Sequence, residues 1–136
     1  MEKRIWHWYT NGSLPKELGS LTAGQLEVLC YEYMRDQNLI SRLTCPIGRG
    51  LRDIDIVGLN SKGENVFAQV TFATDEVTIN KKAERLRGVS GECQAYLFSP
   101  KGESPIQDVV PVRIQDVFDR ADDQLISAMI QPVTPR

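Results

Sequence analysis

The chain has 136 residues, of which 41% are hydrophobic and 25% are charged, and its formal net charge at pH 7 is -2. This length suffices for one domain with a single hydrophobic core that requires no disulfide or structural metal. The acidic balance excludes a strongly basic nucleic-acid-binding protein, because attraction to phosphate supplies most non-specific affinity for DNA.

The sequence also indicates a compartment. No run approaches the roughly 20 apolar residues that a membrane span requires, and the opening MEKRIWHWYT lacks the features of a signal peptide. Cys30, Cys45 and Cys93 are odd in number and widely spaced, which favours reduced core residues over disulfides or zinc ligands. We therefore expect a cytoplasmic protein.

Residues 1–20 are predicted to form an aromatic N-terminal extension across the outside of the core. The segment contains Ile5, Trp6, Trp8 and Tyr9, together with the only histidine of the chain, His7. No partner for acid–base chemistry accompanies His7 nearby in sequence. This favours a segment that covers the core or forms a dimer contact over one that acts in catalysis.

The first helix is predicted to start at Leu21 or Thr22, with Thr22 as its N-cap, and to end near Gln37 or Asn38. Its apolar residues recur at helical spacing: Leu26, Leu29, Cys30 and Tyr33. Three strands are predicted next, over residues 39–46, 51–60 and 65–74, and SKGE forms the hairpin turn between the second and third.

A second helix is predicted from Asp75 to about Arg87, where Gly88 would end it. A strand over 93–100, a strand over 108–115 and a last helix over 116–130 complete the chain. This order predicts an α/β fold with an αβββαβ core and a mixed central sheet flanked by helices. One domain would span residues 1–136, with the core at 21–99 and the extra strand and C-terminal helix at 100–136.

Polar residues stand out on the two strands of the hairpin. Asp53 and Asp55 share one face of the second strand because they alternate with apolar residues, and Gln69 is conspicuous in a third strand that is nearly all apolar or small. Asp55 and Gln69 meet if they share a face, and Glu27 could add a carboxylate from the first helix. Such oxygens suit Mg²⁺, which activates water beside a scissile phosphate.

The order of elements, with the residues Glu27, Asp55, Gln69 and Thr71, resembles the PD-(D/E)XK (restriction-endonuclease-like) nuclease superfamily, most closely its Mrr-like branch. That branch has a helix glutamate, a Gly-rich turn that runs into GID and an apolar residue, and Q-x-K on the next strand. Here GRGLRDIDIVG contains Asp55 at the matching place, and Gln69 and Thr71 occupy the Q and K positions. The resemblance covers the core and implies a Mg²⁺-dependent endodeoxyribonuclease in which Glu27, Asp55 and Gln69 hold the metal.

Thr71 departs from the superfamily pattern, because a hydroxyl cannot stabilise developing negative charge as the motif lysine does. In this superfamily the lysine sometimes comes from a neighbouring element, so Lys81 or Lys82 on the crossover helix is the candidate replacement. A local basic surface is expected to bind the phosphates of DNA. Its predicted members are Arg49, Arg52, Lys81, Lys82 and Arg85.

Each of these residues also has a structural interpretation. Glu27 can be an ordinary flank residue of its helix, and Asp53 can pair with Arg52. Asp55, if buried, needs either a metal or a structural hydrogen-bond partner, and Gln69 can be a satisfied core glutamine. The lysine pair can be a solvated helix face.

Three functions stay open on these grounds. The first is a DNA-acting, Mg²⁺-dependent endonuclease that hydrolyses phosphodiester bonds. The second is a catalytically degenerate module of the same fold that binds DNA or a protein. The third is a small structural or regulatory protein that assembles through Trp6, Trp8 and Tyr9. A domain of this size and acidity has little surface to grip a duplex, so a homodimer or a larger protein partner is expected even for a nuclease.

Overall fold

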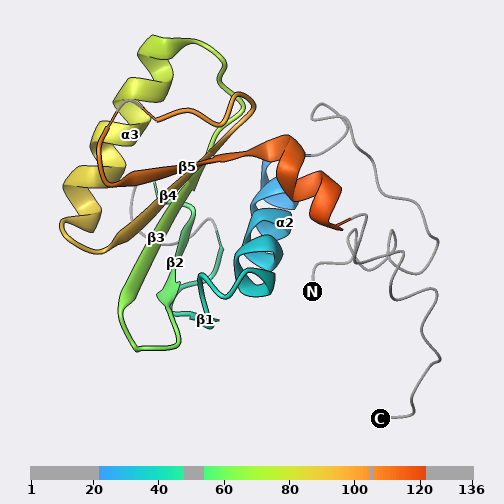
Figure 1. Ribbon diagram of the computed structural model, residues 1–136, viewed down its shortest axis with the longest axis vertical. Helices are drawn as coiled ribbons and strands as arrows, with labels where there is room; N and C mark the ends of the chain where they lie inside the picture. Colours follow the sequence, from blue (N-terminus) through green and yellow to red (C-terminus); the bar gives the residue numbers. More distant parts are fainter. Residues whose placement is uncertain (1–21, 48–53, 105, 122–136) are drawn as a thin grey trace.

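The computed structural model describes residues 22–47, 54–104 and 106–121. Within these ranges a five-stranded sheet, in the order β1-β2-β3-β4-β5, lies between helices (Figure 1). The strands are β1 (Arg42–Leu43), β2 (Ile56–Leu59), β3 (Asn65–Val70), β4 (Gln94–Ser99) and β5 (Val109–Arg113). The helices are α2 (Ala23–Asp36), α3 (Glu76–Ser90) and a last helix that begins at Ile114 and is described as far as Ala121. The predicted α/β class is confirmed.

The helix α2 begins where the sequence predicts, because Thr22 and Gln25 form a capping box. Thr22 Oγ1 accepts the backbone N–H of Gln25 at 3.2 Å, and the side-chain oxygen of Gln25 accepts the backbone N–H of Thr22 at 3.0 Å. These two bonds satisfy donors that the start of the helix leaves unpaired. The helix ends at Asp36, and Asn38 then takes a positive φ of 60°.

The sheet is mixed, as predicted. β1 pairs antiparallel with β2, and β2 pairs antiparallel with β3, whereas β3 with β4 and β4 with β5 are parallel. Asn60 fixes the turn between β2 and β3, since its Oδ1 accepts the N–H groups of Lys62 and Glu64 at 3.0 Å each. Gly63 in this turn has a φ of 78°, which a residue without a Cβ adopts at little cost.

The helix α3 is longer than the sequence predicts. It begins after Asp75, whose carboxylate accepts both the N–H and the hydroxyl of Thr78, at 3.0 Å and 2.6 Å. The prediction that Gly88 ends the helix is wrong, because the helix continues to the buried Ser90. Gly91 is the residue that leaves the helical conformation, with a φ of 58°.

Two apolar cores lie on opposite faces of the sheet, which we call the α2 face and the α3 face after the helix that packs on each. The core of the α2 face includes Leu26, Leu29, Cys30, Met34, Val66, Ala68, Phe98, Val117 and Phe118. The core of the α3 face includes Val57, Phe67, Ile79, Ala83, Leu86 and Leu97. Successive residues of a central strand therefore point to opposite cores, one toward α2 and the next toward α3.

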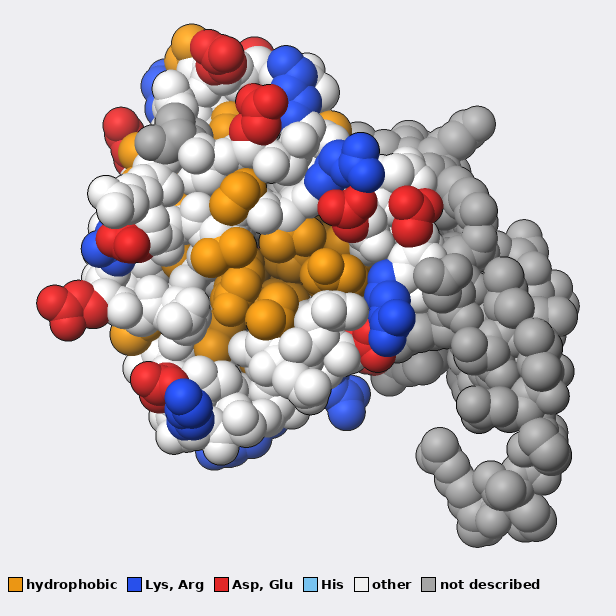
Figure 2. Space-filling model, in the orientation of Figure 1, with side chains coloured by type: hydrophobic (Ala, Val, Ile, Leu, Met, Phe, Trp, Pro, Cys, Tyr) orange, Lys and Arg blue, Asp and Glu red, His pale blue; other side chains and the backbone are white. Residues whose placement is uncertain are grey.

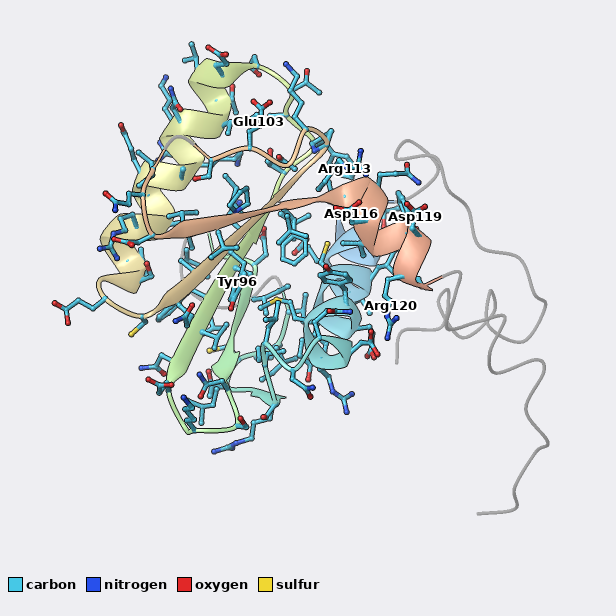
Figure 3. All side chains as sticks on the ribbon, viewed as in Figure 1. Tyr96, Glu103, Arg113, Asp116, Asp119 and Arg120 are labelled. Carbon is cyan, nitrogen blue, oxygen red and sulfur yellow. The ribbon has the colours of Figure 1, made fainter. Side chains whose placement is uncertain are left out.

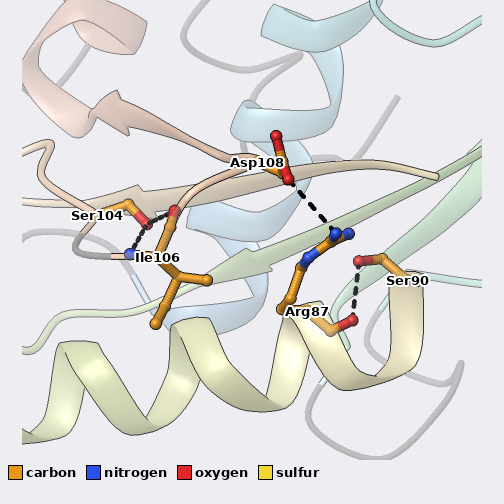
Figure 4. Close-up of polar contacts among 5 residues, drawn as sticks. All are labelled: Arg87, Ser90, Ser104, Ile106 and Asp108. Carbon is orange, nitrogen blue, oxygen red and sulfur yellow. Dashed lines mark hydrogen bonds and ion pairs between the residues drawn. The ribbon is translucent and has the colours of Figure 1, made fainter. Parts of the chain in front are cut away.

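The connection from β4 to β5 runs along the α3 face. Ile106 packs in the core of that face, and Ser104 Oγ accepts the N–H of Ile106 at 3.4 Å and donates to its carbonyl oxygen at 3.3 Å. Just before β5, Asp108 pairs with Arg87 of α3 at 3.4 Å (Figure 4). The connection is thereby fixed to α3 at the point where β5 begins.

The last helix packs on the α2 face, and an ion pair joins it to α2. Arg120 Nε lies 2.6 Å from Asp36 Oδ2. None of the helices within the described ranges is both long and apolar enough to span a lipid bilayer.

Candidate functional site

Asp55 lies at a β-bulge where β2 begins. Its N–H donates to the carbonyl oxygen of Ala68 at 3.0 Å, yet the next residue, Ile56, is the register partner of that same Ala68. Two successive residues on one side therefore oppose a single residue of β3, which defines a bulge. The irregularity directs the Asp55 side chain toward α2, where it lies close to the side chain of Glu27.

The Asp55 carboxylate also extends the ladder between β2 and β3. Its Oδ2 accepts the backbone N–H of Val70 at 2.8 Å. In an uninterrupted antiparallel ladder a backbone carbonyl of the opposite strand would accept that N–H. The carboxylate therefore holds the ends of the two strands together and satisfies a backbone donor that would be costly to bury without a partner.

Glu27 approaches Asp55 from α2, where it is half-buried beside the apolar stripe of the helix. Burial, followed by the negative charge of Asp55 and the hydrogen bond between the two side chains, raises the pKa of Glu27 to about 7. A hydrogen bond between two carboxyl groups requires a proton on one of them. Below about pH 7 Glu27 therefore holds a proton that it can donate to Asp55.

Cys30 lies one helical turn from Glu27 and is fully buried. Burial first, and then the charges of Asp55 and Glu27, raise the pKa of its thiol well above the ordinary value. A buried, neutral thiol is a poor nucleophile and a poor metal ligand. The i, i+3 spacing of Glu27 and Cys30 predicts that the two side chains lie close together on the helix. Apolar periodicity alone predicts only that Cys30 is a core residue.

Gln69 lies on the opposite face of the sheet from this carboxylate pair. Its neighbours Ala68 and Val70 pack in the core of the α2 face, so alternation along β3 directs Gln69 to the α3 face. The β2–β3 register, continued without a bulge, would set Asp55 opposite Gln69 on a shared face. The bulge breaks that alternation, and the expectation that these two side chains share a face is wrong.

Gln69 and Thr71 both present oxygen atoms to the buried interior of the α3 face. Gln69 is 5% exposed, and its Oε1 has no hydrogen-bond partner among the described residues. Thr71 is equally buried; its Oγ1 accepts the N–H of Ala73 at 3.0 Å, and its backbone N–H donates to Phe98. The Thr71 hydroxyl thus closes the turn that leads into α3, on the face of the sheet away from the carboxylate pair.

The candidate lysines also lie across the sheet from Glu27 and Asp55. Lys81 is exposed and Lys82 half-buried on α3, whose buried residues pack on the α3 face. Arg85 is exposed on the same helix. The structure therefore does not bring either lysine beside the carboxylate pair, where a replacement for the motif lysine would be needed.

Several predicted site residues lie outside the described ranges. These are Arg49, Arg52 and Asp53 before β2, and Trp6, His7, Trp8 and Tyr9 in the N-terminal extension.

The arrangement offers a site with two carboxylates. In the part of the chain that the structure describes, no group of three or more His, Cys, Asp or Glu side chains is placed to hold a metal ion. Mg²⁺ in proteins is usually held by one or two carboxylates, with water and substrate phosphate as further ligands. Glu27 and Asp55 fit this donor set once their shared proton has left, and Gln69 does not fit it.

Fold and site together define an α/β protein with a five-stranded mixed sheet and a closely spaced carboxylate pair, Glu27 and Asp55, beside its β2–β3 hairpin. The chain matches no protein-family model, and neither a curated protein nor a solved structure is significantly similar to it.

Proposed function

We propose that this protein acts on DNA as a member of the PD-(D/E)XK nuclease superfamily, with Glu27 and Asp55 as the protein ligands of a catalytic Mg²⁺. The close approach of these two side chains carries the proposal, because one comes from α2 and the other from the start of β2. A helix glutamate that meets a hairpin aspartate is what the superfamily pattern calls for. The strand order and the helix between β3 and β4 support the αβββαβ core.

Mg²⁺ at this pair would lower the pKa of a bound water and neutralise charge on the scissile phosphate. The pair must lose its shared proton to act as two ligands, so the raised pKa of Glu27 makes metal binding stronger above about pH 7. The backbone of Val70 offers a further oxygen. A strand residue directs its N–H and C=O to the same neighbour, and the N–H of Val70 meets Asp55.

A second candidate function keeps this fold without the chemistry. Thr71 occupies the position of the motif lysine and its hydroxyl accepts the N–H of Ala73, while Lys81 and Lys82 lie on the helix across the sheet. None of these three residues supplies a positive charge beside the carboxylate pair. This favours a nuclease-fold module that binds DNA or a protein partner in the cytoplasm without cutting.

A cleavage assay separates the two candidates. Wild-type protein, Glu27→Gln and Glu32→Gln would be incubated with supercoiled plasmid and with branched DNA, in Mg²⁺ and separately in Mn²⁺. Glu32 is the matched control because it lies on the same helix and pairs only loosely, at 4.0 Å, with Arg35. We expect cleavage by wild type and by Glu32→Gln, and its loss in Glu27→Gln.

Two other outcomes decide against the nuclease proposal. Cleavage that persists in both Glu27→Gln and Asp55→Asn would show that the active site lies elsewhere. DNA binding by wild type with no cleavage in either metal would establish the degenerate module instead.

A further inference from the structure

A groove opens on the α2 face of the sheet, beside the edge strand β5. Its volume is about 570 Å³. Its apolar lining comes from Tyr33, Leu39, Tyr96, Val110 and Val112. Figure 2 shows apolar side chains gathered at the centre of this face, with charged side chains around them. The groove is therefore apolar inside and polar at its border, as ligand and peptide sites commonly are.

Arg113 and Asp116 form part of that border. They are joined by an ion pair of 2.7 Å at the junction of β5 and the last helix. Tyr96 lies below them in the middle of the face (Figure 3). Val110 is 41% exposed within the groove, so an occupant would remove apolar surface from water without first displacing a packed side chain.

The edge of the sheet restricts what can occupy this groove. Pro111 stands in the middle of β5, is exposed, and has no N–H to donate. A second strand that paired along β5 would lack a hydrogen bond at its centre, which is a common obstacle to edge-to-edge association. The occupant of the groove must therefore dock through side chains and not by strand pairing, which argues against a second copy of β5.

We propose that the N-terminal aromatic segment of the same chain, residues 5–9, docks in this groove. The sequence of the segment is IWHWY. Tryptophan and tyrosine combine a large apolar ring with one polar atom, which suits an apolar floor beside a polar border. A groove of about 570 Å³ falls within the range of roughly 300 to 1,000 Å³ that accommodates a drug-sized ligand, and so has room for two aromatic side chains.

The length of chain before α2 permits this docking. Tyr33 and Gln37, at the C-terminal end of α2, line the groove, while the N-terminal segment joins the other end of the helix at Thr22. The 14 residues of α2 span about 21 Å at roughly 1.5 Å per residue. The residues from Tyr9 to Thr22 can extend about 40 Å at roughly 3.3 Å each. The segment therefore reaches the groove with length to spare.

Tryptophan fluorescence tests the proposal directly, because both tryptophans of the chain, Trp6 and Trp8, lie in this segment. The full chain would be compared with Val110→Asp and with Val89→Asp. The two valines are matched, since each is 41% exposed, but Val89 lies on α3 and outside the groove. We expect emission of the wild type at short wavelength. In Val110→Asp it should move to longer wavelength with about twofold stronger quenching by acrylamide, and Val89→Asp should match the wild type.

Circular dichroism would confirm that both variants are folded, and the milder Val110→Ser serves if Val110→Asp is not. Wild-type emission typical of fully solvated indole, or equal behaviour of the Val110 and Val89 variants, would overturn the proposal. A short-wavelength emission that disappears on dilution would place the segment in the groove of a second copy, and would also overturn it.

Discussion

Glu27 and Asp55 link protonation to folding at the scale of single residues. Each would be an ordinary carboxylate if it were alone in water. Burial, then the negative charge of Asp55 and the hydrogen bond between the two side chains, raise the pKa of Glu27 from 4.5 to about 7. The folded protein consequently binds this proton more tightly than the unfolded chain does. Stability from this source is fully present below about pH 4.5 and is lost as the pH rises through 7.

The first prediction concerns the pH dependence of Glu27→Gln. As the pH rises from about 4.5 to about 8, the free energy of unfolding of the wild type should fall relative to that of the variant. The expected difference is on the order of 1–2 kcal/mol after allowance for partial solvent screening. The glutamine has no proton to release, so its own profile should be flatter. Urea unfolding at several pH values measures the difference. Glu32→Gln should follow the wild type, and parallel profiles for wild type and Glu27→Gln would contradict the shared proton.

The second prediction separates two roles of Asp55. Asp55→Asn keeps an oxygen that can accept the N–H of Val70, which Asp55 Oδ2 accepts at 2.8 Å. Asp55→Ala leaves that donor without its side-chain partner, and an unsatisfied donor of this kind costs about 1–3 kcal/mol. We therefore expect the asparagine variant to be the more stable by about that amount in urea unfolding at pH 7. Equal stability of the two variants would mean that the bond does not support the sheet.

At the scale of secondary-structure elements, local sequence predicts where the helices begin but not where α3 ends. The capping box at Thr22 and the cap at Asp75 are local signals, and both helices begin where those signals lie. The end of α3 depends on tertiary packing, because Ser90 is buried one turn after Leu86. Burial of that last turn extends the helix past Gly88, the glycine at which a local rule ends it.

The third prediction uses the two glycines of this region. Gly88 is helical, exposed, and has open space where a Cβ would lie, so Gly88→Ala should stabilise the protein by about 0.5–1 kcal/mol. Gly91 has a φ of 58° and a ψ of -121°, a conformation that L-residues rarely adopt. Gly91→Ala should therefore destabilise it by about 1–3 kcal/mol. Thermal unfolding measures both, and equal signs for the two substitutions would contradict the observed helix end.

The hairpin shows why the candidate site is only partly predictable from the sequence. Strand order and sheet type follow from the alternation of apolar residues and the order of the elements, and the structure confirms the mixed sheet. The same alternation sets Asp55 and Gln69 on one face, because a regular ladder has a period of two. The bulge at Asp55 inserts one residue into the ladder and reverses the face of everything on one side of it. The regular alternation of Ile54, Asp55 and Ile56 gives no sign of such an insertion, whereas the approach of Glu27 from the first helix is among the possibilities that the sequence offers.

At the scale of the whole molecule, charge limits how the proposed nuclease could bind DNA. A net charge of -2 gives no general attraction to phosphate, so any basic surface must be local. On α3, Lys81 and Arg85 are exposed and Lys82 is half-buried, across the sheet from the carboxylate pair. A duplex held against α3 would therefore not place its phosphate beside Glu27 and Asp55 of the same chain. A homodimer would remove this difficulty. The α3 helix of one protomer would bind the duplex, and the carboxylate pair of its partner would reach the phosphate.

The last prediction tests whether α3 binds DNA at all. Lys82→Glu should weaken binding to duplex DNA, and the slope of log affinity against log salt concentration should become shallower by about one for each phosphate that the variant no longer neutralises. Lys62→Glu is the control, because Lys62 is exposed at the turn between β2 and β3 and its substitution changes the net charge by the same amount. Fluorescence anisotropy over a salt series measures both variants. An equal decrease of affinity in the two would point to net charge alone, whereas a decrease confined to Lys82→Glu would locate the duplex on α3 and make a second protomer necessary for any cleavage at the carboxylate pair.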